Sequence, residues 1–214
     1  MAHHPLAGGG AHRQPLLDVR PAAGGVAVFL YTPQVYHTFA HTTAVLDELG
    51  LDILDARIVP DDGGFSLDTY IVHEYGDDAT DIEQLSEDIR KRLAPIVARA
   101  RAPDSEWRPN VTRRVSRQAR MFSTPTTIKF SLDEGKARTV MELTTADRPG
   151  LLSDVGEVFL NEKIDIETAK ILTIGEKAED VFYITDLEKK PLSDDRCDSL
   201  KRSLTERLIR AGSN

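Results

Sequence analysis

The sequence of 214 residues is long enough for one large domain or for two domains of about 100 residues, and either can bury a hydrophobic core without disulfides or metals. Hydrophobic residues make up 40% and charged residues 29% of the chain, which excludes wholesale disorder, and no apolar run approaches the ~18 residues of a membrane helix. The net charge of −8 excludes a protein that coats nucleic acid with its whole surface, and a single cysteine, Cys197, excludes an internal disulfide framework. We therefore expect a cytoplasmic protein with no membrane or nucleic-acid partner.

The first predicted elements are two strands and a helix. Residues 1–15 are rich in Gly, His and Pro and lack an apolar period, so we expect a flexible leader outside the fold. Two short strands are predicted next, at 16–20 and 26–31, with turn residues between them. A helix follows, and its weaker stripe at helical spacing consists of Phe39, Thr43, Leu46 and Leu49.

A second pair of strands and a second helix come next. The strands are predicted at 51–59 and 65–72, joined by the polar turn residues 60–64. The helix is predicted between residues 82 and 100. Its apolar positions are Ile82, Leu85, Ile89, Leu93, Ile96 and Ala100.

A basic block covers the end of this helix and the expected linker, residues 103–124. Ten Lys or Arg lie between Arg90 and Arg120, against two acidic residues, Asp104 and Glu106. Such a block is typical of a solvated helix face and of a linker that neutralises acidic domains. The alternative is a docking strip for an acidic partner, whereas RNA is disfavoured because aromatic residues are sparse.

The second half of the chain repeats this succession of patterns. Strands are predicted at 126–132 and 139–144, and a helix follows with Asp147 as its expected N-cap and Pro149 in its first turn. The apolar stripe of this helix consists of Leu151, Leu152, Val155, Val158 and Phe159.

Two strands and a helix complete the second half. The strands are predicted at 164–173 and 180–185, joined by turn residues 175–177. The last helix has its apolar positions at Cys197, Leu200, Leu204 and Leu208.

The two halves form an internal repeat with an offset of 113 residues. Leu30, Thr32, Val45, Asp52, Ile53, Ala56 and Ile58 fall on Leu143, Thr145, Val158, Asp165, Ile166, Ala169 and Ile171. We therefore predict two homologous domains, 16–102 and 125–214, each with the order strand, strand, helix, strand, strand, helix.

This order predicts an α+β fold made of two ferredoxin-like sandwiches. Each is expected to have an antiparallel four-stranded sheet with two helices on one side. Because the last element is a helix, the second sheet has to take its fourth strand from 126–132, so the strand order is permuted.

The string Asp-Arg-Pro-Gly-Leu-Leu at 147–152, where a strand ends and a helix begins, resembles the signature of ACT domains, the amino-acid-sensing modules of metabolic regulation. The neighbouring strings narrow this resemblance; they are FSTPTTIKF (122–130), TVMELTTADRPGLLSDVG (139–156), AKILTIGEKAEDVFYITD (169–186) and LDILDARIVPDDGGFSLDTYIV (51–72). Together they are similar to the carboxy-terminal tandem ACT region of bifunctional uridylyltransferase/uridylyl-removing enzymes, over roughly residues 16–211.

The resemblance implies a regulatory module that senses glutamine or a similar amino acid in nitrogen signalling. It also implies contact of the basic linker with the signalling protein PII or with a catalytic body, and pairing of ACT domains within or between chains. The sequence has neither the Gly-Ser pair followed by two carboxylates of a nucleotidyltransferase nor the His-Asp pair of the hydrolase, so we expect no catalytic residues, metal or cofactor. The alternatives are a free-standing interaction or dimerisation protein and an enzyme without a recognised motif.

The predicted site follows from what a free amino acid presents, a carboxylate and an ammonium group on one carbon. The start of the helix after Gly150 offers unpartnered backbone N–H groups to the carboxylate, and glycine keeps the approach open. The carboxylates of Asp147 and, on an adjoining strand, Asp165 are expected to accept from the ammonium group. The candidate ligand-binding residues are Asp147, Arg148, Pro149, Gly150, Leu151, Leu152, Asp165 and Asp52, with Gln34 and His37 in the first repeat.

Simpler interpretations exist for several of these residues. Asp147 alone suits a plain N-cap as well as a ligand. The first repeat has Gln34 and His37 where the second has Asp147 and Gly150, which makes a complete first site doubtful. His37 and His41 have metal-ligand spacing without a third ligand, so a solvated face is expected. Asp68 and Asp180, at equivalent positions, are expected to be strand-start carboxylates bonded to turn amides.

Overall fold

The structure, a computed structural model, describes residues 13–23, 25–74, 81–100 and 125–212. The first half of the chain contains β1 (Leu16–Ala22), β2 (Gly25–Pro33), α1 (Thr38–Glu48), β3 (Leu51–Pro60), β4 (Phe65–Glu74) and α2 (Ile82–Arg99). The second half contains β5 (Thr127–Asp133), β6 (Arg138–Ala146), α3 (Leu151–Asn161), β7 (Asp165–Ile174), β8 (Lys177–Thr185) and α4 (Asp194–Gly212). The predicted order of elements is confirmed in both halves.

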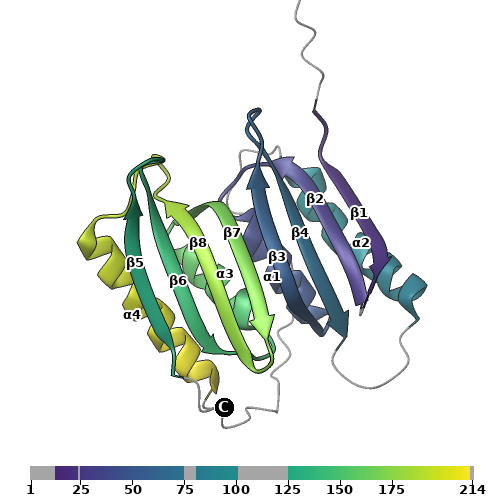
Figure 1. Cartoon of the computed structure of the whole chain (residues 1–214). Helices are drawn as coiled ribbons and strands as arrows, with labels where there is room; N and C mark the ends of the chain where they lie inside the picture. The colour runs from purple at the N-terminus through teal and green to yellow at the C-terminus, as the bar shows by residue number, and fades with distance from the viewer. Residues whose placement is uncertain (1–12, 24, 75–80, 101–124, 213–214) are drawn as a thin grey trace, which may run out of the picture.

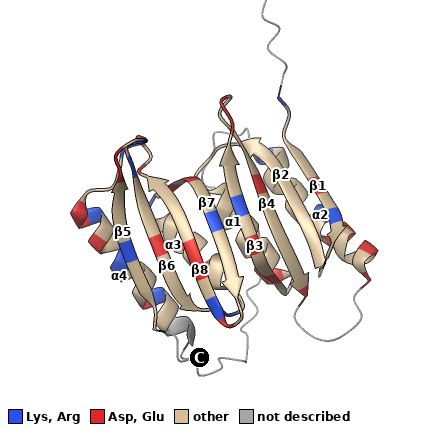
Figure 2. Ribbon diagram, in the orientation of Figure 1, with Lys and Arg blue, Asp and Glu red and all other residues tan. Residues whose placement is uncertain are grey.

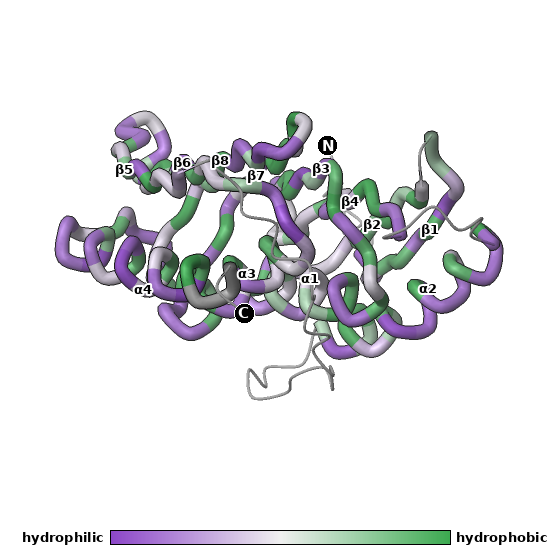
Figure 3. Tube along the Cα trace, turned by 90° about the horizontal axis from the view of Figure 1, so that it is seen from below, coloured by the Kyte–Doolittle hydropathy of each residue, from purple (hydrophilic) through white to green (hydrophobic). Residues whose placement is uncertain are grey.

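All eight strands form one antiparallel sheet in the order β1-β2-β4-β3-β7-β8-β6-β5 (Figure 1). The four helices lie in a layer on one face of this sheet (Figure 3). Each half therefore has four strands and two helices, as the predicted ferredoxin-like, permuted α+β fold requires. The outer strands β1 and β5 each come from the start of their half, which is the predicted origin of the fourth strand.

The two halves are related by a local twofold arrangement at the centre of the sheet. Strand β3 pairs antiparallel with β7, and Arg57 lies opposite Lys170, its own equivalent in the repeat. The hydroxyl of Thr168 crosses the same seam and donates to the carbonyl of Ile58 at 2.5 Å. Antiparallel pairing of equivalent positions places the corner after β6 beside the start of β3.

The helix layer has a corresponding contact between α1 and α3. A Cβ added to Gly156 would lie 2.9 Å from both the Cα of Ala40 and the Oγ1 of Thr43, so the two helices approach closely here. Three aromatic rings join the core of the halves, with Phe182 5.2 Å from Phe159 and 6.0 Å from Phe39 in edge-to-face geometry. The hydrophobic core is thus shared by both halves.

Two local predictions are wrong. Helix α3 begins at Leu151 with Gly150 as its N-cap, so Asp147 is not the cap and Pro149 precedes the helix. Asp68 and Asp180 lie within β4 and β8, not at strand starts, and they are only 2% and 1% exposed. Burial raises the pKa of each carboxyl to about 7.

Charged residues of both signs are interspersed over the strands and helices (Figure 2). The predicted linker, 103–124, lies outside the described residues, and so does the predicted leader up to residue 12. The start of the basic block lies on α2, where Arg90 donates to the carbonyl of Val19 at 2.5 Å and Arg92 pairs with Glu48. None of the helices in the described ranges has the length and apolarity needed to cross a membrane.

Candidate functional site

A small pocket, open to solvent, lies at the start of α3 where the two halves meet. Its walls from the first half are Thr43, Asp47, Leu51, Asp52 and Ile53, and those from the second half are Asp147, Arg148, Gly150, Leu151, Leu152 and Ser153. Six of the predicted ligand-binding residues are therefore brought together, namely Asp147, Arg148, Gly150, Leu151, Leu152 and Asp52. Pro149 lies in the same loop.

The loop between β6 and α3 is shaped by backbone hydrogen bonds and by one glycine. The N–H of Asp147 donates to the carbonyl of Glu176 at 2.9 Å, and the N–H of Leu151 donates to the carbonyl of Arg148 at 3.2 Å. Gly150 has a φ of 70°, in the left-handed region that favours glycine. The turn therefore delivers the first N–H groups of α3 to the pocket.

Two carboxylates, those of Asp147 and Asp52, lie in this pocket. Burial raises the pKa of Asp147 to about 6, and the nearby carboxylate of Asp52 adds to the rise. Hydrogen bonds from the backbone of Arg148 and from Thr173 oppose it. Asp52 also lies 3.5 Å, Oδ2 to Nε2, from His73. Two neighbouring carboxylates that are partly removed from water favour a cationic group such as an ammonium.

A third carboxylate lies at the N-terminus of α3, where bare backbone donors were expected. A Cβ built on Gly150 would lie 2.9 and 3.0 Å from the two carboxylate oxygens of Asp47. Gly150 provides no side-chain cap, and the positive end of the α3 dipole attracts a carboxylate. Asp47 of the first half therefore occupies the region predicted for the ligand carboxylate.

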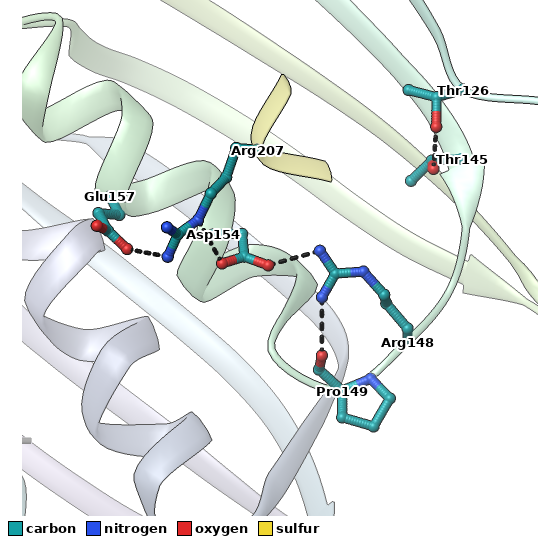
Figure 4. A network of polar contacts seen from close by, with 7 residues as sticks. All are labelled: Thr126, Thr145, Arg148, Pro149, Asp154, Glu157 and Arg207. Carbon is teal, nitrogen blue, oxygen red and sulfur yellow. Dashed lines mark hydrogen bonds and ion pairs between the residues drawn. The ribbon is translucent and has the colours of Figure 1, made fainter. Parts of the chain in front are cut away.

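The side chain of Arg148 is bound within the protein. Its Nη2 donates to Asp154 at 2.5 Å and its Nη1 donates to the carbonyl of Pro149 at 3.1 Å (Figure 4). The guanidinium thus holds the loop against α3, although the residue also lines the pocket.

Asp165 lies away from the pocket that contains Asp147. Its buried carboxylate accepts from the ammonium group of Lys189, and its pKa is raised, chiefly by burial, although Lys189 acts to lower it. The start of β3 lines the pocket, so Asp52 takes the place expected for Asp165.

In the equivalent corner of the first half, the side chain of Gln34 is hydrogen-bonded across the seam between the halves. The amide of Gln34 donates to the carbonyl of Ile166 at 3.1 Å, and neither Gln34 nor His37 lines the described pocket. His37 has a φ of −89°, so this loop lacks the left-handed turn of Gly150. The rings of His37 and His41 stack at 5.0 Å, and the described residues hold no cluster of three metal-ligating side chains.

Sequence reasoning missed Asp47, Thr43 and Ser153. Asp47 had a recognisable signal, because an acidic residue in the last turn of a helix is disfavoured by that helix's own dipole. Its partner, the start of α3, lies about 100 residues further along the chain and is reached only through the pairing of the two halves.

The sequence is similar to bifunctional uridylyltransferase/uridylyl-removing enzymes of several bacteria. It is 39% identical to that of Psychrobacter sp. (strain PRwf-1), over 92% of this chain and 22% of the enzyme. It is 37% identical to that of Stutzerimonas stutzeri (strain A1501), over 96% of this chain and 23% of the enzyme. For Pseudomonas syringae pv. tomato the identity is 40%, over 88% of this chain and 21% of the enzyme. The chain thus spans between 21% and 23% of the length of these relatives, and no protein-family model matches it.

Proposed function

The chain is homologous to one region of the bifunctional uridylyltransferase/uridylyl-removing enzymes, and on this premise we propose that it is a regulatory module with two ACT domains. The module binds a free amino acid, and glutamine is the first candidate. It acts in the cytoplasm, in nitrogen signalling. Its partner is the catalytic part of such an enzyme or the signalling protein PII.

One observation carries the proposal, the pocket between the halves with Asp147 and Asp52 beside the N-terminus of α3. The two carboxylates suit the ammonium group of an amino acid. The N–H groups of α3 suit its carboxylate once the side chain of Asp47 turns away. Leu51, Ile53 and Leu151 supply apolar walls for the methylene groups of the ligand.

In the proposed site the ligand contacts both halves, so its binding can change how the halves pack against each other. Asp47 belongs to α1 and Asp52 to β3, whereas Asp147 and Gly150 belong to the second half. Binding therefore stabilises one packing of α1 against α3 relative to another. The size of this effect is set by the difference between the ligand's affinities for the two packings.

The proposal is tested by titrating glutamine into the chain by calorimetry at pH 7.5 and pH 5. Because the pKa of Asp147 is about 6, this carboxylate is charged at pH 7.5 and protonated at pH 5. We expect binding about tenfold weaker at pH 5, since each pH unit below the pKa lowers the charged fraction tenfold. Asp147→Asn should bind weakly at both values and lose the pH dependence.

The matched control is Glu142→Gln, which removes one carboxylate charge from an exposed position on β6 in the same half. It should bind glutamine like the parent chain. An absence of heat at millimolar glutamine, or equal binding by Asp147→Asn, contradicts the proposal.

A further inference from the structure

We infer that Asp154 and Arg207 are positioning residues, which hold the β6–α3 loop in its binding shape through Arg148 and connect that loop to α4. The inference rests on the proposed function for the identity of the ligand only. The shape of the loop is measurable without any ligand.

Asp154 is the centre of the network (Figure 4). Its side chain lies on α3 and is 0% exposed, yet both of its oxygens have cationic partners. The Oδ2 accepts from Arg148 at 2.5 Å and the Oδ1 accepts from the Nε of Arg207 at 2.8 Å. A buried carboxylate is strongly destabilising unless it is paired and hydrogen-bonded. Both guanidinium groups are therefore held beside Asp154.

Arg148 transmits this constraint to the loop. One guanidinium nitrogen is held by Asp154 while the other donates to the carbonyl of Pro149, the residue next to Gly150. The fork of donors is rigid and planar, so it ties the path of the loop to the first turn of α3. The left-handed turn at Gly150 is therefore stabilised from outside the pocket.

Arg207 extends the network to the last helix. Its side chain comes from α4, and its Nη2 pairs with Glu157 while its Nε bonds Asp154. Asp154 and Glu157 lie one turn apart on α3, so a single guanidinium clamps that turn to α4. A displacement of α4 therefore changes the support of the loop, and a change in the loop is felt at α4.

The first half lacks the elements of this network. Position 41 is equivalent to position 154 and is a histidine, and position 35 is equivalent to position 148 and is a valine. The loop of that half also lacks the left-handed turn, since its N-cap His37 has a φ of −89°. The clamp and the left-handed turn thus occur together, in the second half.

The test is amide hydrogen exchange of residues 148–152 in the ligand-free chain, for Arg207→Met and for Arg202→Met. Both variants remove a guanidinium from α4 and keep an unbranched side chain, but Arg202 is exposed. Loss of a charge-assisted hydrogen bond should speed exchange in the loop about tenfold in Arg207→Met. Arg202→Met should exchange like the parent.

Two further variants distinguish loss of the clamp from general destabilisation of the protein. Arg207→Lys restores a cation beside Asp154 and should recover part of the loop protection. Glu157→Gln, which changes only the partly exposed end of the clamp, should have a small effect. Uniform acceleration of exchange over the whole chain in Arg207→Met, or unchanged exchange in the loop, overturns the inference.

The glutamine titration separates this inference from the proposed function. If glutamine binds the parent chain, Arg207→Met should bind it about tenfold more weakly through the disordered loop. If glutamine fails to bind the parent chain, the proposed function fails, while the exchange result still decides whether Asp154 and Arg207 position the loop.

Discussion

At the scale of single residues, the pocket is defined by a carboxylate from the other half of the chain. Asp47 lies against Gly150 at the N-terminus of α3, where its charge is favoured by the helix dipole. The same charge would oppose the carboxylate of the proposed amino-acid ligand. We therefore expect Asp47 to lower the affinity of the proposed site and to stabilise its empty form.

We expect Asp47→Asn to bind glutamine more tightly, by about threefold to tenfold, because a helix-terminal charge interaction amounts to roughly 0.5–1.5 kcal/mol. The same substitution should lower the melting temperature slightly, since the α3 dipole loses its counter-charge. Calorimetric titration and thermal unfolding measure the two effects, with Glu142→Gln as control. Weaker binding by Asp47→Asn would show instead that this carboxylate contacts the ammonium group.

A second prediction concerns the carboxyl of Asp68, whose pKa burial raises from an ordinary value of 3.8 to about 7 in the folded protein. Unfolding between these pH values releases a proton, so the free energy of unfolding falls as the pH rises from about 4 to 7. Asp68→Asn removes this pH-dependent loss of stability. The variant should be more stable than the parent by about 2 kcal/mol at pH 8 and by much less at pH 4.

Urea unfolding of the parent and of Asp68→Asn at both pH values measures this difference in the free energy of unfolding. Asp180→Asn should behave in the same way, because burial also raises the pKa of Asp180 to about 7. A larger gain at pH 4 than at pH 8 would be incompatible with a buried, protonated carboxyl.

At the scale of elements, the contact between α1 and α3 depends on a glycine. Gly156 faces Ala40 and Thr43 so closely that any added methyl group must push the helices apart. We expect Gly156→Ala to lower the free energy of unfolding by about 1–2 kcal/mol, because overpacking outweighs the gain of up to about 1 kcal/mol in helix propensity.

The matched control is Gly135→Ala in the turn between β5 and β6, where the nearest atom to an added Cβ is the Oδ1 of Asp133 at 3.5 Å. This variant should unfold like the parent in urea. Equal stability of Gly156→Ala and the parent would mean that α1 and α3 separate at no cost.

At the scale of the whole molecule, the halves share a sheet and a core. The β3–β7 pairing continues the sheet across the seam, and Phe39 of the first half packs against Phe182 of the second. We therefore expect one unfolding transition in differential scanning calorimetry, with equal calorimetric and van't Hoff enthalpies. Two separate transitions would show that each half folds on its own and that the seam contributes little.

The sequence by itself determined the elements, their twofold repetition and the permuted sandwich, because strand and helix periods and turn residues are local. It also indicated the loop of Asp147 and Gly150, since a strand end followed by a glycine and a helix start is a local pattern. The N-cap was misassigned, because an aspartate before a helix is a common cap and the left-handed turn at Gly150 is set by surrounding contacts.

Only the tertiary structure decided what surrounds that loop. It placed Asp52 and not Asp165 beside Asp147, brought Asp47 to the N-terminus of α3, and joined Arg148 to Arg207 through Asp154. These contacts depend on the antiparallel pairing of β3 with β7 and on the packing of α3 against α1 and α4. No local pattern encodes that pairing, because it joins residues more than 100 positions apart whose strands are equally compatible with other neighbours.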